Sequence, residues 1–444
     1  MAGKRERSLN ELYLDDPERA DAVVFGRRAA PGRRGFLKGA GLAALSAAVG
    51  GPIAFADRLP SGLLPVALAQ GTPPGGPKIL SFEGKEGVLV SLGDRPLVAE
   101  TPEHQLDDDT TPNAKFFIRN NGIQPQVPAD PEGWTLTVDG EVNTPLGLSL
   151  GDIKKRFPTV DLTMVLECGG NGRSQFNPPA RGNQWTNGGT GCARWTGVRL
   201  RDLLQAAGVK PSASHTGHYG ADQHLSGEAG KVVLSRGMPL AKAMEEHSLV
   251  AWAMNGVPLP AVHGFPVRLV VPGWPGSLSN KWLTRIWVRD KPHDGPGMGG
   301  TSYSVPIKPM VPGGKVDEKN SRDLQSMPVR AIITSPANGT ELGAGARTLA
   351  LRGKAWAGDF TVARVDVSID YGATWLPSTL GQPRNRYDWQ KWQANVTLPS
   401  EGYYEVWARA TDGQGRMQPH VAGNWNPQGY GANAMHRVAV LVSA

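Results

Sequence analysis

The sequence predicts an α+β fold, in which a region that mixes strands with short helices is followed by an all-β sandwich. Three observations support this prediction. Glycine (57 residues) and proline (37 residues) are frequent in the 444-residue chain and lack periodic spacing, which favours many turns and short strands. Apolar and polar residues alternate at period two in several segments. Helical segments with capping residues are short, and all of them precede residue 325.

Length and composition indicate two folded domains behind an N-terminal segment. A chain of 444 residues exceeds what one hydrophobic core usually holds. The contents of 39% apolar and 20% charged residues are typical of a folded globular protein. The net charge of +7 is not gathered into a basic face, so nothing indicates a nucleic-acid partner. After residue 69, no apolar run approaches the ~18 residues of a membrane-spanning helix.

Residues 1–69 have the form of a twin-arginine export signal. The pair Arg33 and Arg34 precedes a small, apolar stretch, 39–56, that contains no charge. The alternative is an amphipathic surface helix, but the stretch has no polar face. We therefore expect a periplasmic or extracytoplasmic protein that is exported folded. Two small-x-small cleavage sites follow the stretch, at 54–56 and 67–69, and the second is favoured because polar sequence starts at Gln70. Because folded export suits a protein that acquires a complex cofactor in the cytoplasm, the signal also predicts a cofactor.

The first domain is expected to span residues 70–325. Its opening segment, 70–115, is rich in turns and is expected to wrap the surface of the rest of the domain. Residues 135–140 (TLTVDG) alternate in polarity and end in an Asp-Gly turn, which predicts a hairpin. Short capped helices are expected at three places: 149–157, 200–207 and 240–246.

The second domain is expected to span residues 326–444 and to be all-β. A charged and polar stretch, 317–325, comes after the proline-rich segment 306–314 and marks the boundary. Short strands between turns then predict a β-sandwich. Alternating apolar residues precede two of these turns: Val365, Val367 and Ile369 the first, and Tyr404, Val406 and Ala408 the second.

The chain has two cysteines, Cys168 and Cys192, which in an oxidising compartment can form a disulfide worth roughly 3 kcal/mol. The local sequence of Cys168 favours a different role. This cysteine comes after the apolar run 162–166 and opens the glycine-rich turn 169–172, where the backbone can approach a large group closely. A thiolate at that position, with Arg173 nearby to keep it deprotonated, is a good soft metal ligand.

Several sequence blocks carry a resemblance to a known family. They are 116–120 (FFIRN), 166–174 (LECGGNGRS), 254–260 (MNGVPLP), 263–268 (HGFPVR) and 281–283 (KWL). In order and spacing they resemble the sulfite oxidase family of molybdenum-pterin enzymes. The resemblance runs from about residue 116 to the C-terminus. It implies that Cys168 is the thiolate ligand of the metal, that the second domain is an immunoglobulin-like dimerisation domain, and that the protein is a homodimer.

The resemblance implies a molybdenum–molybdopterin cofactor, whose flat polar ring system ends in a phosphate. Such a site requires cations for the phosphate and hydrogen-bonding groups for the ring edges. His263, Arg268 and Lys281 suit the phosphate. Taken singly, each has a plainer explanation as a surface charge or a core histidine, and their occurrence together supports the assignment. The other candidates for cofactor binding are Phe117, Arg119, Asn120, Asn121, Asp222, Ser279 and Asn280.

The expected substrate is sulfite or another small sulfur oxyanion, which guanidinium groups hold well. Within the resemblance, Arg119 and Arg173 are the candidates for orienting the anion. Tyr303 lies close to where the family keeps an active-site tyrosine, and Trp185 resembles the tryptophan that walls the substrate pocket. The plainer alternatives for these two are a half-buried strand tyrosine and a packing tryptophan.

Two positions depart from the family pattern. Asn121 stands where the animal enzymes have a histidine after the Arg-Asn pair. Gln428, in the segment 425–429 (WNPQG), stands where they have a third arginine. The expected substrate pocket therefore has one positive charge fewer than theirs.

The predicted reaction is the oxidation of sulfite to sulfate. Electrons are expected to pass to a separate c-type cytochrome, because the chain contains no Cys-x-x-Cys-His haem-attachment motif. Three alternatives stay open. A relative that oxidises sulfane sulfur is disfavoured by Arg173, and a methionine sulfoxide reductase by the presence of the second domain. Outside the family, the chain can be an exported binding protein held by a Cys168–Cys192 disulfide.

Overall fold

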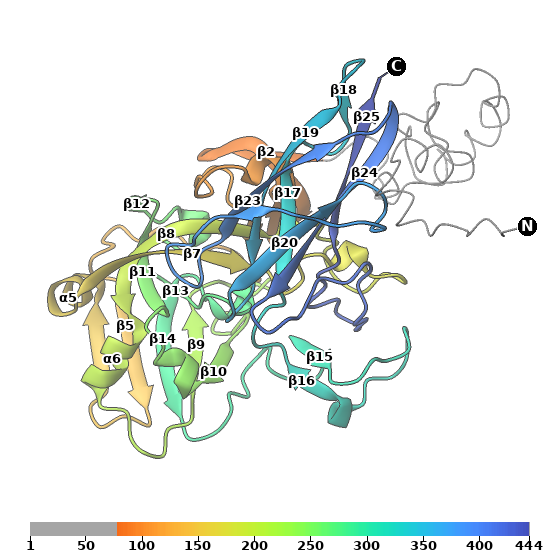
Figure 1. Ribbon diagram of the computed structural model, residues 1–444. Helices are drawn as coiled ribbons and strands as arrows, with labels where there is room; N and C mark the ends of the chain where they lie inside the picture. Colours follow the sequence, from red (N-terminus) through yellow and green to blue (C-terminus); the bar gives the residue numbers. More distant parts are fainter. Residues whose placement is uncertain (1–77, 444) are drawn as a thin grey trace, which may run out of the picture.

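The computed structural model describes residues 78–443. The twin-arginine segment, 1–69, lies outside the described residues, so the export signal stays a prediction. Figure 1 shows two bodies side by side, the first coloured from orange to green and the second from cyan to blue. Within residues 78–443, none of the helices is long and apolar enough to cross a membrane.

A four-stranded antiparallel sheet opens the described chain, with the strand order β1-β2-β3-β4. The expectation that 70–115 only wraps the surface was therefore too simple, since Leu89, Val98 and Ala99 are buried in this sheet. The strands are not predicted from the sequence because their apolar runs are short and interrupted by glycine and charged residues. The strands are β1 (Ile79–Phe82), β2 (Lys85–Asp94), β3 (Leu97–Glu100) and β4 (Ile118–Arg119).

The second sheet has five strands in the order β10-β9-β14-β5-β6. The predicted hairpin is present, because β5 (Thr135–Gly140) pairs antiparallel with β6 (Leu146–Ser149). Its turn begins at Gly140, whose φ of 93° favours glycine. The other strands are β9 (His215–Gly220), β10 (Arg236–Pro239) and β14 (Leu283–Arg289).

The third sheet has the order β12-β11-β8-β7, with β13 also paired to β11. The long antiparallel pair of β7 and β8 runs from Thr159, opposite Val198, to Glu167, opposite Thr190. Cys168 therefore comes directly after a strand, as predicted. The strands are β7 (Thr159–Glu167), β8 (Thr190–Arg199), β11 (Leu249–Met254), β12 (Val257–Pro258) and β13 (Arg268–Val270).

The α-helices are few and short, so the first body is mostly β rather than evenly mixed. Helix α5 (Leu150–Arg156) begins with a capping box between Ser149 and Asp152, and α6 is Leu200–Ala207; both agree with the prediction. Helix α7 (Leu240–Ala243) ends earlier than the predicted residue 246, because the chain turns there to enter β11. Single 3-10 turns occur at Glu103–Leu106, Arg173–Gln175, Ala261–His263, Gly276–Leu278 and Glu318–Asn320.

The second body consists of two β-sheets that share one hydrophobic core, in the orders β17-β19-β23-β22 and β18-β25-β24-β20-β21. The predicted alternation is present, since Val365, Val367, Tyr404 and Val406 all belong to that core. The strands are β17 (Arg330–Ser335), β18 (Thr340–Leu342), β19 (Thr348–Trp356), β20 (Val362–Ser368), β21 (Leu376–Pro377), β22 (Thr379–Leu380), β23 (Gln390–Thr397), β24 (Gly402–Asp412) and β25 (His436–Val442).

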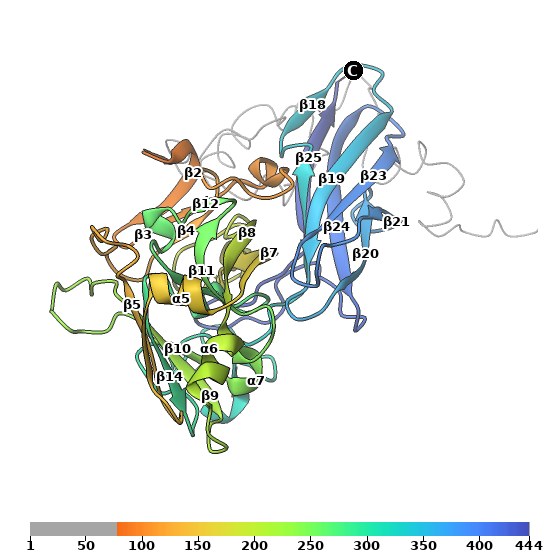
Figure 2. The ribbon, with the colours of Figure 1, turned by 90° about the vertical axis from the view of Figure 1, so that its left-hand side faces the viewer.

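The two bodies pack together along β7 and β8. A buried cluster joins Val165 and Cys192 of the first body to Ile332, Trp356 and Trp389 of the second. Figure 2 shows β7 on the side of the first body that faces the second. The strand that leads to Cys168 is therefore covered by the second body. In the segment of sequence that connects the two bodies, β15 (Ser304–Pro306) and β16 (Ser321–Asp323) form a two-stranded sheet.

Candidate active site

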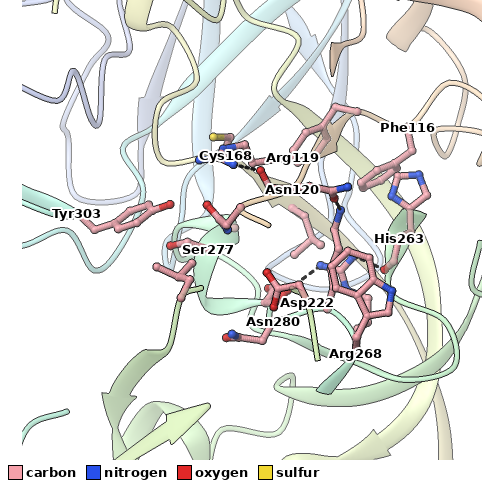
Figure 3. A pocket seen from close by; sticks show the side chains of 18 residues that line it. Phe116, Arg119, Asn120, Cys168, Asp222, His263, Arg268, Ser277, Asn280 and Tyr303 are labelled. Carbon is pink, nitrogen blue, oxygen red and sulfur yellow. Dashed lines mark hydrogen bonds between the residues drawn. The ribbon is translucent and has the colours of Figure 1, made fainter. Parts of the chain in front are cut away.

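A pocket with about 730 Å³ of empty volume opens where Cys168 comes after β7. It brings together segments that are far apart in the sequence. Figure 3 shows Cys168 and Tyr303 at one end of the pocket, with His263 and Arg268 at the other. Of the predicted site residues, only Arg173 and Trp185 are not in its wall. Those that line it are Phe117, Arg119, Asn120, Asn121, Cys168, Asp222, His263, Arg268, Ser279, Asn280, Lys281 and Tyr303.

Cys168 is held by its backbone at the end of β7. Its N–H donates to the carbonyl of Gly189 at 2.8 Å, and its carbonyl accepts from the N–H of Asn171 at 2.9 Å. The next residue packs closely, because a Cβ on Gly169 would lie 3.3 Å from Cβ of Pro275 and 3.4 Å from the ring of Tyr303. Gly172 then takes a φ of 82°, which favours glycine. The turn thus presents the sulfur of Cys168 to the pocket.

Both cysteines are free thiols in the structure. Cys192 lies opposite Val165 in the β7–β8 pair and donates to the Oδ1 atom of Asp388 at 3.3 Å. Burial and the adjacent Asp388 carboxylate raise the pKa of the Cys192 thiol well above its usual value. The structure therefore does not contain the Cys168–Cys192 disulfide on which the binding-protein alternative depends.

Arg268 and Lys281 line the far end of the pocket, and Lys85 contacts His263 of the same wall; we call these three cations the cation cluster. The Nζ atom of Lys85 lies 2.8 Å from Nε2 of His263 and donates to the carbonyl of Phe116 at 2.8 Å. Arg268 donates to the carbonyls of His263 and Ser279, both at 2.9 Å. The cluster therefore contacts both the ring and the backbone carbonyl of His263.

Lys281 connects the cation cluster to the segment after β4. Its Nζ atom donates to Oδ1 of Asn120 at 2.6 Å and to the carbonyl of Val262 at 2.7 Å. Neutral oxygens therefore satisfy its hydrogen bonds, and its charge remains uncompensated by a direct carboxylate contact among the described residues. The arrangement is suited to an anion that approaches from the pocket.

Burial and mutual repulsion destabilise the charged forms of these groups. Burial lowers the pKa of Lys85 to about 7 and that of Arg268 to about 9. The pKa of Lys281 is lowered well below its usual value by burial and then by the other cations, and that of His263 is lowered in the same way. His263 is therefore neutral, and its Nε2 atom accepts from the Lys85 ammonium when that is charged. A bound phosphate would stabilise the charged forms of these groups and raise their pKa values.

Polar atoms without partners also face the middle of the pocket region. Oγ of Ser277 and Oδ1 of Asn280 are buried and lack a hydrogen-bond partner within the described chain. Asp222 lines the same wall, and burial raises the pKa of its carboxyl group to about 6. Unpartnered buried polar atoms are rare in folded proteins, so these atoms indicate a polar ligand.

At the Cys168 end, Arg119 and Tyr303 line the pocket as predicted, but Arg173 does not. Nε of Arg173 donates to the carbonyl of Gln428 at 2.7 Å, and Nη1 donates to the carbonyl of Asn183 at 2.6 Å. Its guanidinium therefore holds two backbone segments together behind the wall. It stacks at 5.5 Å on the ring of Tyr430.

Trp185 is completely buried and packs behind the pocket wall. Its ring meets that of Phe117 edge to face at a centroid distance of 6.0 Å. Trp185 belongs to the hydrophobic cluster that also contains Cys168. In this structure it supports Phe117, which itself lines the pocket.

Sequence reasoning missed several residues of the site, including Lys85, Ser277 and Tyr430. Lys85 lies in a segment expected to be peripheral, and nothing in its local sequence distinguishes it from a surface lysine. Tyr430 stacks on Tyr303 with ring centroids 4.7 Å apart and an interplanar angle of 13°. The only feature of the sequence that indicated a role for Tyr430 was its position two residues after Gln428, where the chain departs from the family pattern.

Two family models match the chain. The oxidoreductase molybdopterin binding domain matches residues 124–296, and the Mo-co oxidoreductase dimerisation domain matches residues 321–443. The sulfite oxidase of Gallus gallus is 34% identical over 354 residues, which cover 77% of this chain and 76% of that protein. The chain belongs to the sulfite oxidase family. The resemblance inferred from the sequence blocks is therefore confirmed.

Other members of the sulfite oxidase family are similar over different shares of their length. The mitochondrial sulfite oxidase of Rattus norvegicus is 36% identical over 370 residues. That alignment covers 78% of this chain but 64% of the rat protein, so the chain spans less than two thirds of that relative. The solved structure of the sulfane dehydrogenase SoxCD from Paracoccus pantotrophus has a TM-score of 0.65 and 26% identity, covering 85% of this chain and 90% of that one.

As a sulfite oxidase family member with the molybdopterin-binding domain, the protein is a molybdopterin oxidoreductase with a molybdenum–molybdopterin cofactor, as predicted. The pocket fits this group. The cation cluster suits its terminal phosphate, and the unpartnered atoms of Ser277 and Asn280 suit the polar edges of its rings. At the opposite end, Cys168 offers the single thiolate that the metal requires.

Proposed function

We propose that the protein oxidises sulfite to sulfate. The observation that carries the proposal is that Arg119 and Tyr303 line the same pocket as Cys168, the candidate metal ligand. A guanidinium and a phenol hydroxyl beside a metal thiolate suit a small oxyanion. The similarity to sulfite oxidases supports the same substrate.

The bound molybdenum centre supplies the two-electron oxidation and the oxygen-atom transfer. The chain supplies binding and position. Arg119 orients the anion, and the hydroxyl of Tyr303 donates to an oxygen of the substrate. Phe117, backed by Trp185, forms an apolar wall that limits water at this end. Cys168 holds the metal in place.

A related sulfur compound is the second candidate, favoured by two observations. The structurally similar SoxCD is a sulfane dehydrogenase. In addition, Gln428 is uncharged at the position where a third arginine would strengthen binding of a divalent anion. Against this candidate stands the positive charge that Arg119 brings to the pocket.

The substrate test uses holoenzyme purified from a host that makes the pterin cofactor. We expect sulfite to reduce a c-type cytochrome with molybdenum near one atom per chain, and Cys168→Ser to abolish the reaction. Thiosulfate and a protein-bound persulfide serve as alternative substrates in the same assay. If the molybdenum-replete enzyme is inert to sulfite but active with a persulfide, the proposed substrate is sulfane sulfur and not sulfite.

The electron acceptor, the dimer and the export route belong to the same proposal. We propose a c-type cytochrome as the acceptor and a homodimer formed through the second body, taken as an immunoglobulin-like sandwich; the match to the dimerisation domain supports the dimer. Sedimentation of the purified protein is expected to give twice the chain mass.

For export, replacing Arg33 and Arg34 by lysine is expected to keep the folded protein in the cytoplasm, and unchanged export would contradict the twin-arginine route.

A further inference from the structure

Gln428 brings no charge to the substrate end of the pocket. Its side-chain amide donates to Oγ1 of Thr301 at 3.1 Å, and its carbonyl accepts from Nε of Arg173. The arginine that the family pattern places here is therefore absent from this position, and the side chain present is occupied elsewhere. Another cation, on a different element, contacts the ring of Tyr303.

That cation is Arg236, the first residue of β10, which belongs to a group of stacked side chains. The guanidinium of Arg236 lies 4.3 Å from the ring centroid of Tyr303. The ring of Tyr303 also stacks on that of Tyr430 at 4.7 Å, and the guanidinium of Arg173 lies 5.5 Å from the ring centroid of Tyr430. Each of the two stacked rings thus has a guanidinium group over it. One of these rings, Tyr303, lines the pocket with Cys168 and Arg119.

Arg236 is a buried and weakly compensated charge. Only 2% of the residue is exposed, and Nη1 donates to the carbonyl of Gly297 at 2.6 Å. Its Nε atom is buried without a hydrogen-bond partner, and no carboxylate of the described residues forms a salt bridge with it. The carboxylate whose charge raises the pKa of Arg236 is Asp323, which is exposed on β16. A charge kept in this environment requires a compensating interaction.

The stack also fixes the position of the Tyr303 hydroxyl. Tyr303 has a φ of 50°, a conformation that non-glycine residues adopt only when their surroundings enforce it. Arg236 and Tyr430 both pack on its ring, and its carbonyl accepts from the N–H of Leu324 at 2.8 Å. A cation on the ring face of a tyrosine strengthens the hydroxyl as a hydrogen-bond donor.

We propose that Arg236 takes the place of the arginine that is absent at Gln428, by placing positive charge behind Tyr303 and holding its hydroxyl toward an anionic substrate. This inference rests on the proposed function, because it concerns how the same pocket binds a sulfur oxyanion. Arg236 is a positioning residue, since it reaches the substrate only through Tyr303. Divalent oxyanions such as sulfite and sulfate gain most from the added charge, and neutral sulfur compounds gain little.

The test measures sulfate binding and sulfite turnover separately in the holoenzyme. For Arg236→Gln we expect the dissociation constant of sulfate, measured by calorimetry, to rise about tenfold. The KM for sulfite is expected to rise by a similar factor, with kcat within about twofold. Arg236→Lys, which keeps the charge, is expected to recover most of the loss. Arg285 provides the matched control, because its guanidinium also stacks on aromatic rings but is neutralised by Asp139; Arg285→Gln is expected to change neither constant.

Restoring the missing arginine separates charge from packing. In the Arg236→Gln background, Gln428→Arg is expected to return the sulfate affinity toward the original value. Molybdenum content is measured for each variant. If Arg236→Gln does not bind the metal, the test uses two other variants of the otherwise unchanged chain, Arg236→Lys and Gln428→Arg. Gln428→Arg is then expected to tighten sulfate binding.

The outcomes distinguish this inference from the proposed function. If the unmodified holoenzyme does not oxidise sulfite but Arg236→Gln still weakens sulfate binding, the proposed function fails and the role of Arg236 stands. If sulfite is oxidised and a metal-replete Arg236→Gln enzyme binds sulfate with unchanged affinity, the inference is overturned. It is also overturned if Gln428→Arg leaves sulfate affinity unchanged in either background.

Discussion

Glu167 and Arg330 form a fully buried ion pair, with Nε of Arg330 2.8 Å from Oε1 of Glu167, directly before the candidate metal ligand Cys168. The pair joins the two bodies, because Glu167 ends β7 and Arg330 begins β17. Arg330 also donates to the carbonyl of Asn171 at 3.1 Å, and Asn171 donates to the Glu167 carboxylate at 3.0 Å. Both sides of the cysteine turn are therefore tied to one guanidinium of the second body.

Replacing Arg330 by methionine is expected to destabilise the protein strongly. The substitution leaves the Glu167 carboxylate buried with Trp356 and Asn171 as its remaining partners. Breaking such a pair from one side costs about 3–5 kcal/mol, which urea unfolding measures. Because the cysteine turn loses its support, molybdenum content is expected to fall as well.

The double variant Glu167→Met with Arg330→Met is the control for this pair. Removing both charges leaves no unpaired ion, so we expect it to be more stable than Arg330→Met alone. If the single and double variants unfold at the same urea concentration, the ion pair is not what stabilises the junction.

The sequence predicted the parts of the site that are continuous along the chain. The turn after β7, with its cysteine between an apolar strand and a run of glycines, can be identified because neighbouring residues carry the whole signal. The helices α5 and α6 were found for the same reason, since a cap and a few apolar positions define each of them. The hairpin of β5 and β6 likewise depends on adjacent residues.

Other parts depend on tertiary structure and left no local trace. Lys85 approaches His263 from a residue 178 positions away, and Arg330 approaches Glu167 across 163 positions. An isolated lysine or arginine in a sequence is usually a surface charge, so neither position was distinguishable. The position of the Arg173 guanidinium was not predictable for a related reason, because proximity to Cys168 in sequence did not reveal that its guanidinium contacts the backbone of Gln428.

Cys168→Ser is expected to lower the molybdenum content while the protein still folds, because the metal loses its protein ligand and the groups that bind the pterin part of the cofactor remain. Cys168 makes its hydrogen bonds through the backbone, which serine retains, and a serine hydroxyl is a poor ligand for a soft metal site. Metal analysis of the purified variant tests this. Cys192→Ser is the matched control, since that thiol donates to Asp388 away from the pocket and its replacement is expected to leave the metal content near that of the unmodified protein. Equal metal content in all three proteins would exclude Cys168 as the ligand.

Anion binding at the cation cluster is expected to weaken as pH rises above neutrality. In the cofactor-free protein the pKa of Lys85 is lowered to about 7 by burial, and a bound anion favours the charged form. Affinity is therefore greatest below pH 7 and falls by up to tenfold for each pH unit above it. Calorimetry with sulfate at pH 6 and pH 8 measures this change, because the charge of sulfate is constant over that range.

Lys85→Met identifies the group responsible. This variant is expected to bind sulfate weakly, and the loss between pH 6 and pH 8 is expected to shrink to the part caused by ionisation of Asp222, whose pKa burial raises to about 6. His263 stays neutral throughout, since its pKa is well below the usual value, and so does not contribute. A loss of affinity in Lys85→Met that is as steep as in the unmodified protein would assign the titration to another group.

Asp222→Asn is expected to stabilise the cofactor-free protein at neutral pH but not under acidic conditions. Burial raises the pKa of the Asp222 carboxyl group from 3.8 to about 6, so the folded state binds its proton more tightly than the unfolded state. The stability due to this group is fully present below about pH 4 and is lost as pH rises through about 6. The gain from the asparagine variant thus grows across that interval, to at most about 3 kcal/mol. Urea unfolding of both proteins between pH 4.5 and pH 7.5 measures the difference, and a difference that is constant over this range would contradict the raised pKa.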